Sequence, residues 1–297
     1  MSDGARAGGR ARPVRTEPPR LDSPCPPLHT SAGMDMILAE NLVKVFPSPD
    51  GSDKRAVDGL SFRVGPGEMY GLLGPNGAGK TTTLRMLSGL MAPSEGRAVL
   101  AGCDVAADAR RVKRNIGFLT AHTGLYQRLS PRELLTFFAE LHGLTAGDAR
   151  QRVRHLVEWL QMDDFAELRC GGLSTGQRQR TNIARALVAD PPILILDEPT
   201  LGLDVLSNRV ILDFIVRERD VGKTVLLSTH YLHEAEVMCD RVGLLHKGRL
   251  VAEGTVQELL EQTGEPHLNE AFLRIVGESE SVLPPAPAPA APEGKPG

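Results

Sequence analysis

The sequence predicts an α/β fold in which a block of helices is inserted between strands of a mostly parallel sheet. Polar and apolar residues alternate over Ile37–Phe46 and Ala56–Val64, as expected for half-buried strands. Two later runs, Ile193–Leu196 and Thr224–Ser228, are short and continuously apolar, which is typical of parallel strands buried on both faces. Between these two groups, residues 131–189 carry apolar side chains at helical spacing.

Three further elements complete this expected order. Met69–Leu73 is a short buried strand that runs into a glycine-rich loop. Near the end of the chain, Arg241–Leu245 and Arg249–Ala252 flank Lys247-Gly248, and this arrangement predicts a β-hairpin. No repeat with a period of 20–50 residues is visible, so a solenoid is not expected.

Composition divides the chain into three parts. Residues 1–33 are rich in Arg, Pro, Gly and Ala, and we expect a disordered extension or a start assigned too early, with the true start at a later methionine. Residues 34–276 should form the folded domain, with its helical part at about 120–189. Residues 277–297 end in a Pro/Ala-rich tail that we also expect to be disordered.

The bulk composition excludes several classes of protein. No apolar run approaches the roughly 18 to 20 residues that span a bilayer, and no signal-peptide core is visible. The four cysteines are widely spaced and form no CxxC pair, which argues against a zinc site or a disulfide framework and fits a reducing cytosol. A net charge of −3 gives no reason to expect a nucleic-acid partner.

A glycine-rich loop follows the strand at 69–73 and fits the pattern G-x-x-x-x-G-K-[ST]. Its glycines let backbone N–H groups converge on phosphate oxygens, and the helix that follows adds its dipole. Lys80 should reach the β- and γ-phosphates, and Thr81 should be a ligand of Mg²⁺. The motif therefore predicts a nucleoside triphosphate site formed by Gly74, Pro75, Asn76, Gly77, Ala78, Gly79, Lys80, Thr81 and Thr82.

Polar residues follow two of the expected core strands at the edge where open α/β sheets bind ligands. Asp197 and Glu198 come directly after Ile193–Leu196. Asp197 suits Mg²⁺ through a bound water, and Glu198 suits the role of orienting and polarising an attacking water. His230 ends the other strand in the same way, and it is either a structural histidine or a group that hydrogen-bonds the γ-phosphate.

The stretch LSTGQ at 173–177 predicts the start of a helix that can bind an anion. Ser174 and Gln177 form an S-x-x-Q capping box, and many structural helices begin in this way. Gly176 adds a reason to expect a ligand, because a glycine exposes the backbone for close approach. The glycine-rich loop of the same chain, however, already holds its own triphosphate.

Taken together, these motifs resemble the ATP-binding cassette of ABC transporters over about Ile37 to Ala271. GPNGAGKTT resembles the Walker A loop, LSTGQ the signature motif and ILILDEPT the Walker B strand with its catalytic glutamate. The resemblance implies a RecA-like P-loop NTPase core with an N-terminal antiparallel β subdomain and an inserted helical subdomain. It also implies roles for Asp204 in the D-loop, His230 as the switch histidine and Phe46 as the aromatic residue stacked on adenine.

The same resemblance implies a head-to-tail dimer, most simply a homodimer, with two ATP molecules between the subunits. Ser174, Thr175, Gly176 and Gln177 would then contact the γ-phosphate held by the other subunit, Lys80, Glu198 and His230 would serve hydrolysis, and Thr81 and Asp197 would hold Mg²⁺. Two positions depart from the family pattern. Thr175 stands where glycine is most common, and Ala121 stands where the family has a glutamine that touches Mg²⁺ and couples the site to the membrane subunit.

A single cassette of this kind resembles the separate ATP-binding subunit of a bacterial exporter. FLTAHTGLYQRLSPRELL and LILDEPTLGLDVLSNRVILDFI are similar to cassettes of sodium-efflux and drug-export systems. We therefore expect a separately encoded membrane permease as partner and a location at the cytoplasmic face of the cell membrane. The alternative is a mechanochemical or regulatory ABC ATPase without a role in transport. The chain lacks the long heptads or zinc insertion of the mechanochemical kind, and its Lys80 and Glu198 are intact, unlike those of a catalytically silent regulatory cassette.

Overall fold

The computed structural model of the protein describes residues 35–47, 52–120 and 123–282, and these residues belong to one compact unit. The predicted extension at 1–33, the unusual Ala121 and the end of the Pro/Ala tail lie outside the described residues. The domain boundaries therefore remain predictions. Within the described ranges, no helix is long and apolar enough to cross a membrane.

An antiparallel sheet is formed by the first strands, in the order β2-β1-β4-β5. Its central strand β1 (Ile37–Phe46) pairs with β2 on one side and with β4 on the other. Both pairings are interrupted by bulges, which let the sheet twist. The bounds of the other strands are β2 (Lys54–Val64), β4 (Glu95–Leu100) and β5 (Cys103–Asp104).

The second sheet has the order β10-β9-β3-β8-β7-β6 and is parallel except for its last hairpin. The strands β3, β7 and β8 are buried along their whole length, which explains why their sequences are continuously apolar. Their bounds, with those of the rest of the sheet, are β3 (Met69–Leu73), β6 (Ile116–Leu119), β7 (Ile193–Asp197), β8 (Thr224–Thr229), β9 (Arg241–His246) and β10 (Arg249–Gly254).

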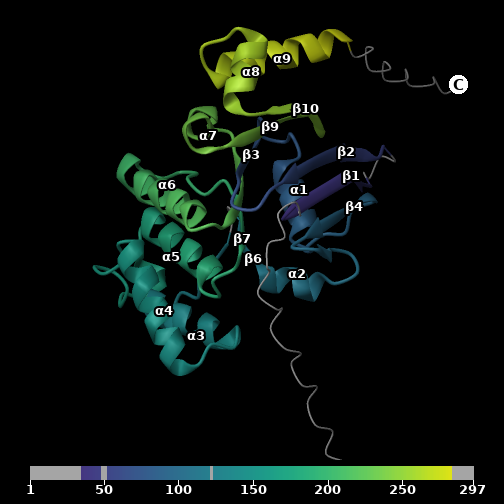
Figure 1. The fold of residues 1–297 in the computed structure, drawn as a ribbon. Coiled ribbons are helices and arrows are strands. Elements are labelled where there is room, and N and C mark those ends of the chain that lie inside the picture. Colours follow the sequence, from purple (N-terminus) through teal and green to yellow (C-terminus); the bar gives the residue numbers. More distant parts are fainter. Residues whose placement is uncertain (1–34, 48–51, 121–122, 283–297) are drawn as a thin grey trace, which may run out of the picture. The chain divides into compact units, whose positions relative to one another are not determined.

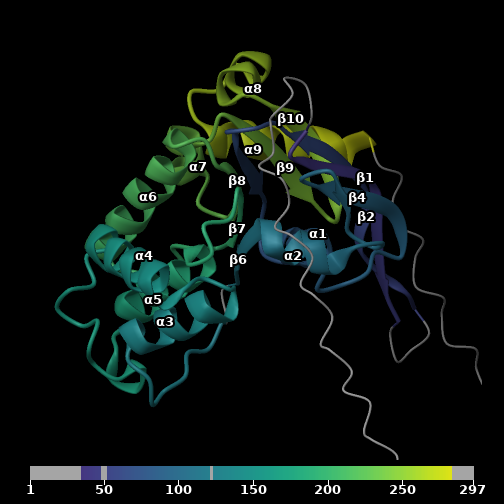
Figure 2. The same cartoon turned by 60° about the horizontal axis from the view of Figure 1, so that its bottom comes forward.

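Alternate side chains of these strands divide the core into two clusters. Ile193 and Ile195 pack with the antiparallel sheet and with α1 (Lys80–Leu87), whereas Leu194 and Leu196 pack with the helices of the opposite face. Figures 1 and 2 show α1 and α2 on the side of the antiparallel sheet, and α5 and α6 on the other side. The bounds of these helices are α2 (Ala109–Asn115), α5 (Thr175–Leu187), α6 (Val205–Asp220) and α7 (Leu232–Met238).

The inserted helical block is formed by α3 (Pro131–Leu141), α4 (Ala146–Trp159), the short 3₁₀ turn η1 (Cys170–Gly172) and α5. The sequence predicted a helical block over 131–189, and within it residues 142–145 separate α3 from α4, while residues 160–174, which include η1, separate α4 from α5. The left-handed backbone of Gln161 ends the helical path there. The helical block lies in the lower left part of Figure 1.

Two C-terminal helices follow the last hairpin, α8 (Val256–Thr263) and α9 (Leu268–Val282). α9 continues six residues past 276, where the sequence analysis placed the start of the tail. The first proline after residue 276 is Pro284. A proline disfavours helical backbone in the residue before it, and residues 277–282 contain no proline that would interrupt the helix.

Candidate functional site

The glycine-rich loop connects β3 to α1, as predicted from the sequence. Its last glycine, Gly79, has φ 110°, and a Cβ there would lie 2.5 Å from the carbonyl oxygen of Ala56. Gly79 is therefore required both by its backbone conformation and by the close approach of β2. The loop brings the first turn of α1 to the mouth of a cavity.

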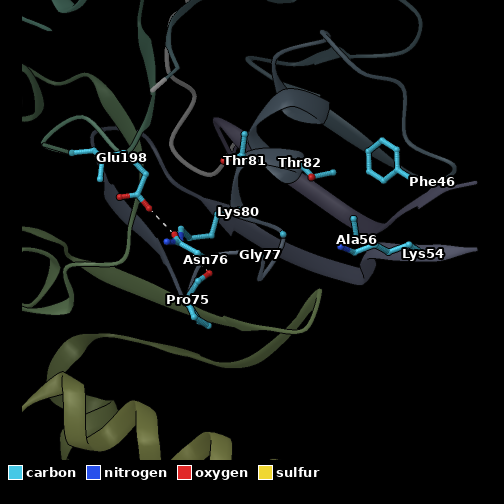
Figure 3. A pocket seen from close by; sticks show the side chains of 12 residues that line it. Phe46, Lys54, Ala56, Pro75, Asn76, Gly77, Lys80, Thr81, Thr82 and Glu198 are labelled. Atoms are coloured by element: carbon cyan, nitrogen blue, oxygen red, sulfur yellow. Dashed lines mark hydrogen bonds and ion pairs between the residues drawn. The ribbon is translucent and has the colours of Figure 1, made fainter. Parts of the chain in front are cut away.

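This cavity has a volume of about 630 Å³, and Figure 3 shows the side chains that line it. Most of the predicted loop residues contribute, together with residues from β1, β2 and the loop after β7. The lining residues are Phe46, Lys54, Ala56, Pro75, Asn76, Gly77, Gly79, Lys80, Thr81, Thr82, Glu198 and Leu201. Gly74 and Ala78 belong to the same loop but do not line the cavity.

Lys80 is buried, with 6% of its surface exposed. Its Nζ donates hydrogen bonds to the carbonyl oxygens of Gly74 (2.7 Å) and Pro75 (3.3 Å), and it lies 3.2 Å from Oε1 of Glu198. Figure 3 shows this ion pair as a dashed line. A buried ammonium group needs several acceptors, and here the loop and Glu198 supply them. The lysine is thus held at the bottom of the loop, where phosphate oxygens could bind it.

Asp197 ends β7 and is almost completely buried. Its Oδ1 accepts hydrogen bonds from the hydroxyl groups of Ser228 (2.6 Å) and Thr81 (3.1 Å). These groups all offer oxygen atoms, the ligand type that Mg²⁺ prefers. Thr81 and Asp197, predicted separately from two motifs, therefore lie in contact and fit a magnesium site.

Glu198 has a left-handed backbone, with φ 50°. This conformation costs a residue other than glycine about 1 kcal/mol or more, and it persists only where the surroundings fix it. The Glu198 N–H donates to the carbonyl oxygen of Ser228 (3.0 Å), which anchors the strained residue to β8. Its side chain contacts His230, whose Nδ1 lies 2.8 Å from Oε2. The backbone strain therefore directs this carboxylate between Lys80 and His230.

Phe46 lies at the opposite end of the cavity from Glu198 (Figure 3). Its ring is partly exposed, and Nζ of Lys44 lies 5.5 Å from the ring centroid. The same cavity is also lined by Lys54, Ala56 and Leu201, which were not predicted from the sequence as site residues. Lys54 could have been found from the pairing of β1 with β2, because that register places it opposite Phe46, a predicted site residue.

The LSTGQ stretch starts α5 as predicted, but it does not line this cavity. The N–H of Gln177 donates to Oγ of Ser174 (3.3 Å), and the Ser174 N–H donates to Oε1 of Gln177 (2.9 Å). Ser174 and Thr175 are exposed. The predicted capping box is present, and none of its residues lines the cavity of the phosphate loop.

The structure gives Gly176 a reason that the sequence analysis did not foresee. A Cβ at this position would collide with Oγ of Ser207 and lie 3.0 Å from its Cβ. Ser207 belongs to the first turn of α6, so the glycine allows α5 and α6 to pack closely. Intrachain packing is sufficient to require this glycine.

Asp204 also lies apart from the cavity and is the N-cap of α6. Its Oδ1 accepts from the N–H groups of Ser207 (2.9 Å) and Leu206 (3.0 Å), and its Oδ2 accepts from the hydroxyl of Ser207. The hydrogen bonds from Ser207 and Leu206 hold the pKa of Asp204 below its ordinary value. The carboxylate is thus fixed at the start of α6, beside Ser207 and Gly176.

Residues 57–201 match the ABC transporter family. The ABC transporter ATP-binding protein NatA of Bacillus subtilis is 39% identical over 220 residues, which cover 74% of this chain and 89% of that protein. The chain belongs to the ABC transporter family.

Export-type ABC cassettes are similar too. The Nod factor export ATP-binding protein I of Burkholderia pseudomallei is 44% identical over 209 residues (70% of this chain, 69% of that protein). A daunorubicin resistance ATP-binding protein of Streptomyces coeruleorubidus is 41% identical over 226 residues (76% and 71%).

Solved ABC cassettes confirm the fold. The structure of an ATP-binding subunit of an ABC transporter superposes with a TM-score of 0.74 at 30% identity and covers 81% of this chain and 99% of the other. A cassette solved as a dimer in a post-hydrolysis state with ADP and Pi superposes at 0.69 with 26% identity, covering 74% and 98%. The predicted α/β cassette and its activity as an ATP-binding and ATP-hydrolysing subunit of the export type are therefore confirmed.

Proposed function

We propose that this cassette is one half of a homodimer that binds two ATP molecules between its subunits and drives a separate membrane permease. Each ATP would lie between the phosphate loop of one copy and the LSTGQ helix start of the other. The observation that carries this proposal is the position of α5. Its N-terminus, with exposed Ser174 and Thr175, is absent from the lining of the cavity in its own chain. A similar cassette solved as a dimer supports the dimeric state of this proposal.

The triphosphate would occupy the cavity between Phe46 and Glu198. The backbone N–H groups of 74–79 and the start of α1 offer a positive site for the phosphates, and Lys80 adds its charge. The adenine ring would stack on Phe46. Thr81 and Asp197 would hold Mg²⁺, which neutralises charge on the phosphates when it is bound.

Hydrolysis would depend on Glu198 and His230. Glu198 would orient the attacking water and accept its proton, and the backbone of β8 holds that carboxylate in place. His230 contacts Glu198 and would also donate to the γ-phosphate, and this contact supports the functional alternative for this histidine. Ser174, Thr175, Gly176, Gln177 and Asp204 would complete the site from the second copy.

The missing glutamine at Ala121 bears on coupling to the permease. We propose that hydrolysis survives this change, because Glu198 lines the cavity and Asp197 contacts Thr81 of its lining. Coupling would run through other groups of the loop after β6, for which His122, outside the described residues, and Thr123 are candidates. The hydroxyl of Thr123 lies 2.9 Å from that of Thr120, at the end of β6.

The substrate is carried by the permease and is not encoded in this chain. Sodium and a drug or antibiotic are the two cargo classes that we propose, and the export and drug-resistance proteins among the relatives favour the second. Through the permease, the cassette would sit at the cytoplasmic face of the cell membrane. Copurification of a multi-span membrane protein with the tagged chain would separate this proposal from an ABC ATPase without a transport role.

The head-to-tail dimer is tested by Glu198→Gln. This change removes the base but keeps the shape of the site, so ATP should bind and remain. On a sizing column with ATP, the variant should elute as a dimer, and without nucleotide as a monomer. The control is Glu198→Gln combined with Lys80→Ala, which should stay monomeric. A monomer of Glu198→Gln at saturating ATP would contradict the dimer.

A further inference from the structure

Glu234 lies in the first turn of α7, four residues after His230, and it does not line the cavity. Its carboxylate accepts two hydrogen bonds from different parts of the chain. Oε2 accepts from the hydroxyl of Thr200 (2.9 Å), and Oε1 accepts from Nδ2 of Asn208 (2.8 Å). One side chain of α7 therefore joins two segments that lie outside its own helix.

Each of the joined segments carries a residue of the proposed site. Thr200 follows Glu198 by two residues and is buried, with 3% of its surface exposed. Asn208 lies one turn into α6, the helix that begins at Asp204. Because α7 follows His230, the Glu234 carboxylate connects the chain segments of the proposed base, the proposed phosphate sensor and the D-loop.

The orientation of the Asn208 amide matches the Glu234 carboxylate. Within the described residues, Oδ1 of Asn208 is buried and has no hydrogen-bond partner. The opposite orientation of the amide would place this oxygen against the Glu234 carboxylate, which can only accept hydrogen bonds. The hydrogen bond from Nδ2 to Glu234 therefore fixes this orientation, although it leaves a buried oxygen without a partner among the described residues.

The loop between β7 and α6 is also fixed from the side of α5. Nε2 of Gln179 donates to the carbonyl oxygen of Pro199 (2.7 Å). Glu198, the residue before Pro199, has the strained backbone described above. The loop is therefore held by α5 at Pro199 and by α7 at Thr200, and such fixation is what a strained residue needs to persist.

We infer that Glu234 is a positioning residue that makes the loop at 198–204, α6 and α7 move as one body. This inference rests on the proposed roles of Glu198 and His230. Loss of the Glu234 carboxylate would let Glu198 and His230 shift relative to the γ-phosphate. Since none of the three contacting residues lines the cavity, ATP affinity would be unchanged while the rate of hydrolysis falls.

The first test is Glu234→Ala in the full chain. We expect kcat for ATP to fall by roughly ten- to a hundredfold, the size of effect that misplacement of a catalytic group produces. The dissociation constant of a fluorescent ATP analogue should stay within about twofold of the original value. Glu236→Ala is the matched control. Its carboxylate lies on the same helix, accepts from the N–H of Leu268 (3.1 Å) and contacts His267 (3.2 Å), so its loss should leave kcat unchanged.

The second test restores the contact with different chemistry. Asn208→Asp alone would set two carboxylates against each other and lower kcat. Glu234→Gln alone would keep both hydrogen bonds if the Asn208 amide turns over, so its kcat should stay near the original. The double variant Glu234→Gln/Asn208→Asp again pairs a donor with an acceptor, and its kcat should recover most of the loss caused by Asn208→Asp.

The outcomes separate this inference from the proposed function. Full kcat in Glu234→Ala, or additive effects without recovery in the double variant, would show that Glu234 does not position the site. A parallel loss of ATP affinity would also contradict the inference, because it would assign the effect to binding. If Glu234→Ala does not fold, the Asn208→Asp pair still decides. If Glu198→Gln still hydrolyses ATP, the proposed role of Glu198 as base is wrong. That result would say nothing against the hydrogen bonds of Glu234.

Discussion

The N-termini of α1 and α5 can both bind an anion through free N–H groups and the helix dipole, but their surroundings differ. α1 begins at Lys80 inside a cavity, with a buried lysine and a conformationally demanding glycine loop before it. α5 begins at Thr175 on the surface, where the side chains of Ser174 and Gln177 accept hydrogen bonds from each other's backbone N–H groups. The first start lines a cavity of its own chain, whereas the second carries its own structural cap. In the proposed dimer, a phosphate at α5 would come from the second copy.

The largest expected effect tests the first helix start. Lys80→Ala removes the buried charge and should weaken ATP binding by roughly ten- to a hundredfold, the range expected for lost hydrogen bonds to a charged group. Equilibrium binding of a fluorescent ATP analogue measures this loss. Lys223→Ala is the control, since Lys223 is also largely buried but pairs with Glu218 and Asp190 away from the cavity. Equal affinity of Lys80→Ala and the unmodified protein would contradict the assigned site.

The second helix start is tested by Ser174→Ala. If Ser174 contacts the phosphate of a second copy, ATP turnover should fall roughly tenfold while ATP binding by the monomer stays unchanged. The variant should also lose about 1 kcal/mol of stability with its N-cap. Thr255→Ala removes the matching cap of α8 and should show the same drop in melting temperature with full turnover. If Ser174→Ala and Thr255→Ala show equal turnover of ATP, Ser174 acts only as a helix cap and does not contact a phosphate.

A smaller effect is expected at the base end of the cavity. Phe46→Ala should weaken ATP binding about fivefold, because stacking on a partly exposed ring contributes about 1 kcal/mol. Titration with ATP and with tripolyphosphate distinguishes stacking from a general disturbance, since only ATP should be affected. Phe137→Ala serves as control because Phe137 is half exposed on α3 and does not line the cavity.

The smallest effect concerns the packing of α5 on α6. Gly176→Ala should lower the free energy of unfolding by about 1 kcal/mol, because the collision with Ser207 outweighs the better helix propensity of alanine. Adding Ser207→Ala should return part of this loss in thermal unfolding. If Gly176→Ala is as stable as the unmodified protein, packing against Ser207 does not require the glycine. The remaining reason would be close approach of a ligand to its backbone.

Sequence periodicity located the elements that are long or strongly patterned. The hairpin β9-β10 and the strands β1, β7 and β8 lie within a few residues of their predicted bounds. The short strand β6 was not predicted, because a run of four residues carries too little pattern. It becomes a strand through its pairing with β7, in the register of Ile116 with Ile193.

By itself, the sequence determined the chemistry of each motif: the phosphate loop, the Asp197-Glu198 pair and the capped start of α5. Spacing and residue type suffice for these features, because each lies within one short segment. Only the tertiary structure decided what joins them. Phe46 meets Lys54 through strand register, Gly176 is required by Ser207, and Glu234 connects Thr200 to Asn208. Such contacts join residues far apart in the chain, and they exist only once the sheet and its helices have packed.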